Sequence, residues 1–386
     1  MDRRAFIRVV GGGVITAAGV SVAGCSTGVP AAAVAAWQGP GDEPDLRRWV
    51  LGYAILAPHS HNLQSWLVDL RTPDVIVLRV DRERLLPETD PLSRQIVMSQ
   101  GTFIELLDLA ARERGHRAEI TLFPEGAFGP AQVDDRPVAH IRLVPDATVA
   151  RDPLFAQILR RHTNRNAYDP ARPVPAAAWA AMQAAVQPHP IGWGHASAQD
   201  MSALERHRAI AQEAWRIEMV TPRTILESYH WLRIGGAEIA AHRDGLSITS
   251  PMLVALDRLG LFDRTQAPAP DAMATTLQIK DFNAKLATTS GFLWMVSQDN
   301  ERATQIAAGR AYARVQLAAT AHGVVMQPLQ QALQEYAEQA GPYADIRALV
   351  GATQPAQTVQ MWARVGFAEP VGPAPRRGVQ AHVLSG

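Results

Sequence analysis

Several short stretches rich in β-branched, aromatic and other apolar residues predict β-strands. The expected strands cover residues 74–80, 118–123, 138–144, 291–297 and 358–367. Longer stretches rich in alanine and leucine predict helices at residues 94–114, 175–186, 200–219 and 300–322. A shorter helical pattern starts near Asp45 and ends at Pro58. Strands interleaved with helices favour a layered α/β or α+β sheet protein.

The two longest helical stretches share a spaced pattern of small residues. The set Gly101, Leu109-Ala110-Ala111 and Gly115 recurs 208 residues later as Gly309, Leu317-Ala318-Ala319 and Gly323. Glycine inside an apolar helix permits close approach of a neighbouring backbone. Coincidence between two alanine-rich helices is the alternative interpretation. We favour an internal duplication, which predicts two related halves that face each other as a fused pseudo-dimer.

The composition is that of an ordinary globular protein, with 386 residues of which 47% are hydrophobic and 19% charged. Lysine plus arginine and aspartate plus glutamate both number 37, so no net charge attracts nucleic acid. The only lysines are Lys280 and Lys285, so the sequence does not favour lysine nucleophile chemistry. The single cysteine, Cys25, excludes intrachain disulfides and cysteine-based metal sites.

The first 25 residues have the pattern of an export signal. The motif Arg3-Arg4-x-Phe6 resembles a twin-arginine signal, and Val22-Ala23-Gly24-Cys25 resembles a lipobox whose cysteine is lipidated. The apolar run between them is shorter than the roughly 20 residues that span a bilayer. We therefore expect an exported, periplasmic or membrane-anchored lipoprotein. Residues 26–44 form an Ala/Pro/Gly-rich spacer, and membrane contact is expected only through the leader or its lipid.

A loop with two histidines, LAPHSHNLQSW, follows the first predicted helix. In an extended chain His59 and His61 would point to the same side, and paired imidazoles can bind zinc or iron. No third ligand is placed by spacing, whereas zinc usually takes at least three from the protein. A metal site is therefore the lesser alternative, and none is predicted.

A second polar stretch, LRRHTNRNAYDPARPVP, gathers arginines around a hydroxyl group. Arg161 and Arg165 flank His162 and Thr163, and forked guanidinium groups beside a hydroxyl bind phosphate well. A solvated basic surface is the alternative, and it is the more frequent one for such a run taken alone.

Together these stretches resemble the nitroreductase family of FMN enzymes. RHTNRNAYD resembles the family's Arg-x-Ser/Thr-x-Arg/Lys opening, and APHSHNLQSW resembles its Pro-Ser-x-x-Asn-x-Gln-Pro-Trp loop, with His59 and Ser65 as departures. GRAYARVQLAATAHGVVMQPLQ resembles its long core helix and glycine turn, and WARVGFAEPVGPAPRRGV its C-terminal strand and basic tail. With its leader and doubled core, the chain is most similar to Acg-type FMN-binding oxidoreductases over residues 45–380.

The resemblance implies an α+β, three-layer α-β-α fold, with residues 45–150 as the first half and 151–386 as the second. Residues 220–290 carry no family motif and could form a lid. The family binds FMN across its dimer interface, which here implies one site between the halves. Its expected residues are Arg161, His162, Thr163, Arg165, Gly323, Val324, Arg376 and Arg377 from the second half, and Pro58, His59, Ser60, Asn62 and Gln64 from the first.

The roles implied by the resemblance follow from the parts of FMN. The arginines would hold the phosphate, Asn62 and Gln64 the pyrimidine edge, and a backbone N–H near Gly323-Val324 the N5 atom. The mirror-image site lacks both motifs, so one FMN per chain is expected. No catalytic side chain is expected, because the flavin itself is the reactive centre.

Two functions remain open from the sequence. The first is an FMN-dependent oxidoreductase that moves two electrons through flavin N5 to a quinone or a nitroaromatic, with NAD(P)H as a possible donor. The second is a slow FMN-binding or sequestering protein, because nicotinamide donors are scarce outside the cytoplasm. The mature chain is expected to be a monomeric pseudo-dimer without a nucleic-acid partner. No G-x-S-x-G or H-E-x-x-H motif supports a hydrolase or a metalloprotease.

Overall fold

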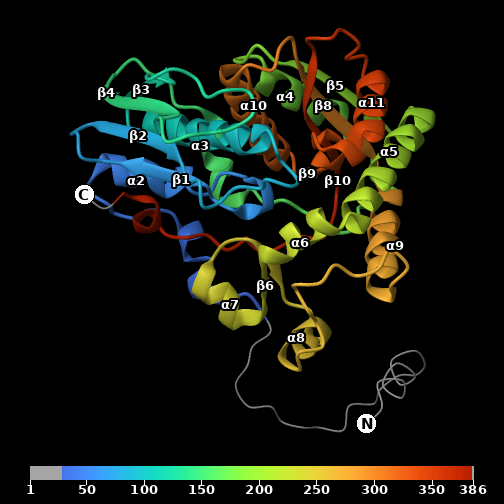
Figure 1. The fold of residues 1–386 in the computed structure, drawn as a ribbon. Helices are drawn as coiled ribbons and strands as arrows, with labels where there is room; N and C mark the ends of the chain where they lie inside the picture. The colour runs from blue at the N-terminus through green and yellow to red at the C-terminus, as the bar shows by residue number, and fades with distance from the viewer. Residues whose placement is uncertain (1–27, 385–386) are drawn as a thin grey trace.

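A computed structural model describes residues 28–384, and its main feature is a pair of four-stranded antiparallel sheets (Figure 1). The first sheet has the order β1-β2-β4-β3 and the second the order β5-β8-β10-β9. The strands of the first sheet are β1 (Trp66–Asp69), β2 (Val75–Val80), β3 (His116–Leu122) and β4 (Ala139–Pro145). Those of the second are β5 (Gly192–Ser197), β8 (Gly291–Ser297), β9 (Val325–Pro328) and β10 (Thr358–Gly366).

The sheets follow the same plan in both halves. In each, the first two strands are neighbours, a 20-residue helix follows the second strand, and the last strand lies between the second and third. These helices are α3 (Arg94–Glu113) and α10 (Arg302–Ala321), which begin 208 residues apart as the sequence pattern does. The shorter helices α2 (Leu46–Ala54) and α4 (Ala176–Val186) precede the first strand of each sheet.

Helices α3 and α10 pack against each other at the repeated glycines. A Cβ atom on Gly101 would lie 2.1 Å from the Ile306 carbonyl oxygen, and one on Gly309 would lie 1.8 Å from the Met98 carbonyl oxygen. Only residues without a side chain fit at this crossing. Farther along, the buried Glu105 carboxylate accepts hydrogen bonds from Arg310 Nε at 2.7 Å and Arg314 Nη1 at 2.8 Å.

The layers around the two sheets differ. The second sheet packs on α4 and α10 through Met295 and Val365, and on its other face Phe292 and Trp362 join a cluster with helices α5 (Met201–Val220) and α11 (Ala340–Leu349). The first sheet buries one face only, because Ile141 points into the core while Arg142 is exposed. The α+β class is confirmed, but the α-β-α layering expected for the whole chain holds only around the second sheet.

A long insertion separates β5 from β8. Besides α5 it contains α6 (Pro222–His230), β6 (Leu232–Ile234), α7 (Gly235–His242), β7 (Leu246–Ile248), α8 (Pro251–Arg258) and α9 (Met273–Ala287). Strands β6 and β7 form a small parallel sheet, and Ile225, Tyr229 and Val254 belong to an apolar cluster of the insertion's own. The insertion includes the region 220–290 for which the sequence suggested a lid.

Short 3₁₀ helices lie in the connecting segments: η1 (Ala31–Ala33), η2 (Ala35–Gln38), η3 (Ser60–Asn62), η4 (Pro153–Arg160), η5 (Gln330–Leu333), η6 (Ala337–Gln339) and η7 (Val379–His382). The first two lie in the expected spacer, which is folded here with Ala33 and Trp37 buried. The proposed leader, residues 1–25, lies outside the described residues. Between residues 28 and 384, no helix has the length and apolar character needed to span a bilayer.

Candidate functional site

The two-histidine loop lies between α2 and β1 and is held by the first turns of α3. Thr102 Oγ1 donates to the Pro58 carbonyl at 2.7 Å, and the Ser60 N–H donates to Ser99 Oγ at 3.4 Å. His61 and Asn62 have positive φ angles of 47° and 56°, a conformation that is unfavourable outside glycine. Such backbone strain is typical of sites that a fold keeps for function.

Two buried arginines from distant parts of the chain meet beside this loop. Arg161 donates to the Leu56 carbonyl at 2.9 Å and to Gln316 Oε1 on α10 at 3.0 Å. Arg376, in the C-terminal tail, donates to the Ala57 carbonyl at 3.1 Å and to the side-chain oxygen of Asn62. Within residues 28–384 neither arginine forms a salt bridge. The structure therefore places residues of the middle motif, the loop and the tail side by side.

Burial affects the charge state of both guanidinium groups. It lowers the pKa of Arg161 to about 10, and burial with the nearby charge of Arg161 lowers the pKa of Arg376 to about 9. Both values stay above neutral pH, so two positive charges are buried close together. Buried like charges without a counter-ion are costly, and an anion bound between them would remove that cost.

Several buried polar atoms here have no partner among the described residues: Arg161 Nε, His162 Nε2, Tyr312 Oη, Arg376 Nε and Arg377 Nε. Buried donors are nearly always satisfied in native proteins, so these atoms are candidates for hydrogen bonds to a ligand. Every one of these atoms can donate a hydrogen bond. The set therefore fits an oxygen-rich anion such as the phosphate of FMN.

Arg165 and His61 lie close to one another at the same site. Arg165 is exposed to solvent, yet desolvation by the surrounding protein lowers its pKa. Desolvation first, and then the charge of Arg165, lower the pKa of His61 to about 4, so His61 is neutral at pH 7.

The side chains of Asn62 and Gln64 form more hydrogen bonds within the protein than the sequence suggested. Asn62 Nδ2 donates to the Gly245 carbonyl at 3.3 Å and to the Pro375 carbonyl at 3.1 Å. Gln64 is fully buried, donates to the Arg243 carbonyl at 2.9 Å and accepts from the Arg377 N–H at 2.9 Å. Both side chains thus connect the loop to the insertion and the tail.

Both ring nitrogens of His59 have hydrogen-bond partners within the protein. Its Nδ1 lies 2.8 Å from the Ser60 carbonyl, and its Nε2 accepts from the Ser65 N–H at 3.1 Å. Burial lowers the pKa of His59 to about 3, so the ring is neutral. Across residues 28–384, no group of three or more histidine, cysteine, aspartate or glutamate side chains is arranged to hold a metal ion.

The glycine turn at Gly323 lies outside the hydrogen-bonded network described above. Gly323 has a φ angle of 66°, and a Cβ atom there would have nothing within 4 Å, while Val324 is buried. The segment that contacts the arginine motif comes two residues later, where Thr163 forms an isolated parallel bridge with Met326 and the Asn164 N–H donates to the Met326 carbonyl. The role of Gly323 and Val324 toward flavin N5 remains a prediction.

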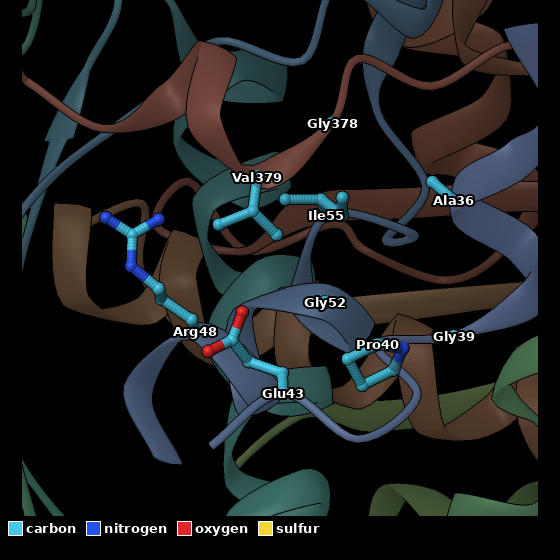
Figure 2. Close-up of a pocket in the computed structure, with 9 residues that line it drawn as sticks. All are labelled: Ala36, Gly39, Pro40, Glu43, Arg48, Gly52, Ile55, Gly378 and Val379. Carbon is cyan, nitrogen blue, oxygen red and sulfur yellow. The ribbon is translucent and has the colours of Figure 1, made fainter. Parts of the chain in front are cut away.

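Two surface pockets lie elsewhere. One, of about 160 Å³, lies between the spacer, α2 and the tail, and is lined by Ala36, Gly39, Pro40, Glu43, Arg48, Gly52, Ile55, Gly378 and Val379 (Figure 2). It is smaller than the several hundred Å³ usual for a cofactor site. The other, of about 450 Å³, lies along α4 and α10, but Arg112 and Arg314 on its wall already pair with carboxylates.

Sequence reasoning missed three residues that lie near the arginines. Gln316 accepts from Arg161, the Tyr312 hydroxyl is buried close to it, and the Trp37 ring centre is 5.4 Å from the guanidinium carbon of both Arg161 and Arg376. Gln316 and Tyr312 lie in the repeated helix, where apolar packing was the expected role. Trp37 lies in a stretch that composition alone marks as a spacer.

Comparison with known proteins gives relatives over most of the chain, although no protein-family model matches it. It is 28% identical over 345 residues to "Putative NAD(P)H nitroreductase Rv3131" of Mycobacterium tuberculosis, covering 86% of this chain and 88% of that protein. It is 29% identical over 208 residues to "Probable NAD(P)H nitroreductase PigM" of Serratia sp., covering 49% and 52%. The solved FMN-dependent nitroreductase NfnB from Mycobacterium smegmatis, in complex with NADPH, aligns with TM-score 0.36 and 17% identity over 60% of this chain and 96% of that one.

Proposed function

We propose that this homologue of nitroreductase-like proteins is an FMN-dependent oxidoreductase that takes electrons from NAD(P)H and passes them to a small acceptor such as a quinone or a nitroaromatic. The observation that carries the proposal is the pair Arg161 and Arg376, two buried charges without a carboxylate partner in the described chain. The names of the relatives in the preceding comparison support the reductant and the reaction class.

The residues present fit FMN at its phosphate end. Arg161 and Arg376 would hold the phosphate, and Thr163 and Arg165 lie on the same segment as Arg161. Asn62 orients Arg376 through its side-chain oxygen, and Gln316 orients Arg161. When bound, FMN supplies two-electron transfer at N5, so the protein needs to position the cofactor and need not supply an acid or base.

We also propose that the two halves arose by duplication and form a pseudo-dimer of the Acg type with one flavin site. The identical strand order of the two sheets and the glycine contacts between α3 and α10 support this. Export through the leader, with lipid attached at Cys25, remains part of the proposal from sequence alone.

The alternative, a slow FMN-sequestering protein, has one observation in its favour. The insertion contacts the loop directly, because the Gly245 N–H donates to the Asn62 carbonyl at 3.2 Å and His61 Nε2 lies 3.2 Å from Ser228 Oγ. Such contacts would restrict access to a bound flavin.

Two measurements test the proposal. The purified protein is expected to be yellow and to release one FMN per chain on denaturation; a colourless protein that takes up no added FMN contradicts it. Rapid mixing of the holoprotein with NADH or NADPH is expected to bleach the flavin absorbance. Absence of bleaching with either donor would favour the sequestering alternative.

A further inference from the structure

We propose that Trp37 is a positioning residue for the flavin phosphate: its indole face holds Arg161 and Arg376 side by side, and residues 30–38 close that end of the site. The inference rests on the proposed FMN function and goes beyond it, because it assigns a role to the N-terminal segment that precedes both halves.

Trp37 lies beside both buried arginines of the phosphate end and beside the His162 ring. The guanidinium carbons of Arg161 and Arg376 are each 5.4 Å from its ring centre, within the range of cation–π attraction. The His162 ring lies 5.0 Å from the indole, tilted by 43°. One side chain therefore fixes two arginines that come from segments more than 200 residues apart.

The segment around Trp37 is fastened to the same tail that carries Arg376. Trp37 Nε1 donates to the Ala374 carbonyl at 2.8 Å, and the Arg376 N–H donates to the Ala33 carbonyl at 2.9 Å. Trp37 is only 8% exposed and Ala33 is fully buried. The spacer thus forms a bonded cover over the arginine pair, and a phosphate held there would leave only when this cover or the opposite side opens.

Electrostatics explains why an aromatic face suits this position. The two guanidinium groups repel each other, and within residues 28–384 no carboxylate pairs with either. A carboxylate would neutralise them and compete with phosphate, whereas the negative face of an indole attracts cations without accepting hydrogen bonds from their N–H groups. The unpartnered Nε atoms of both arginines agree with this arrangement.

The test compares FMN with riboflavin, which has the same ring system but no phosphate. In the full chain freed of flavin, Trp37→Leu keeps apolar bulk and removes the aromatic face. It is expected to raise the Kd for FMN about tenfold, equivalent to about 1.4 kcal/mol, and to speed FMN release. The Kd for riboflavin is expected to stay within about twofold of wild type. Trp193→Leu, on β5 in the second sheet, is the matched control and should alter neither value.

Each other outcome overturns the inference. Equal weakening of FMN and riboflavin would mean a general packing role, and tighter FMN binding would mean that Trp37 stands where the phosphate belongs. If Trp37→Leu does not fold, Trp37→Phe decides by the same ratio, with an expected loss of FMN affinity of about threefold. A wild-type chain that binds no FMN would refute the proposed function itself, whereas FMN binding without a phosphate-specific loss in the variant would refute only the role of Trp37.

Discussion

The crossing of α3 and α10 gives the sharpest prediction about the fold, because a single methyl group cannot be accommodated there. In Gly101→Ala the added Cβ would lie 2.1 Å from the Ile306 carbonyl oxygen, whereas ordinary contacts begin at 3.4 Å. The obstacle is helix backbone, which cannot rotate away, so the helices must separate by about 1 Å. A gap of that size forfeits a quarter to a half of the dispersion energy between the facing atoms.

We expect Gly101→Ala to lower the free energy of unfolding by about 3 kcal/mol, the upper end of overpacking costs, and the melting temperature by roughly 6 °C. FMN affinity should fall as well, because α3 holds the two-histidine loop while α10 carries Gln316 against Arg161. The matched control is Gly341→Ala in α11, where a Cβ would meet nothing within 4 Å and helix propensity favours alanine.

Thermal and urea unfolding with and without FMN would measure these effects. The reasoning is refuted if Gly101→Ala unfolds within 1 °C of wild type, or if Gly341→Ala is destabilised as strongly. A third informative result would be destabilisation with unchanged FMN affinity, which would contradict the claim that the helix crossing sets the distance across the site.

Three further predictions concern charges. Arg376→Leu should weaken FMN binding by about 10- to 100-fold in calorimetry, with Arg376→Lys between it and wild type because it keeps the charge and loses the fork. Glu105→Gln should cost about 3 kcal/mol in urea unfolding, because it leaves two arginines short of a buried carboxylate; although burial raises the pKa of Glu105, the neighbouring His189 and the charges and hydrogen bonds of Arg310 and Arg314 lower it to about 2. His59 and His61 stay neutral in the folded state at pH values where the unfolded chain protonates them, so their contribution to stability is full above pH 6.5 and is lost as the pH falls toward 4. The double variant His59→Asn/His61→Gln should therefore have a flatter dependence of unfolding free energy on pH than wild type between pH 6.5 and 4; equal slopes would contradict the assignment.

Much of the fold could be predicted from local sequence because its longer elements have strong periodicity. The strands at 74–80, 118–123, 138–144, 291–297 and 358–367 and the two repeated helices are confirmed within one to two residues. Strands β1 and β9 have four residues each, too short for alternation to be visible, and β5 carries two glycines that have low strand propensity. The partners of β5 and β9 are distant in sequence, so only tertiary pairing identifies these two strands, whereas β1 pairs with the neighbouring β2 and is missed because it is short.

The charged residues of the candidate site could be predicted from the sequence, whereas the residues placed there by tertiary packing could not. Arginines near the middle of the chain and at its end stood out, and the structure places Arg161 and Arg376 together. The Gln64 side chain forms its hydrogen bonds with the Arg243 carbonyl and the Arg377 N–H only because the insertion and the tail fold over the loop. Trp37 gave only one signal in the sequence, because it is a large aromatic residue in an alanine-rich stretch. A spacer that packs against nothing does not need such a residue.

The chemical difference between the halves is located on the helix pair itself. Gln316 in α10 accepts from Arg161, and the residue 208 positions earlier in α3 is Asp108, which pairs with Arg310 and Arg112. A neutral amide orients an arginine and leaves its charge available to an anion, whereas a carboxylate neutralises it. An anion placed at the second position would meet negative charge from Asp108 and Glu105. Under the proposed duplication, equivalent positions would therefore support one phosphate site and disfavour the other, which is the physical reason to expect one flavin per chain.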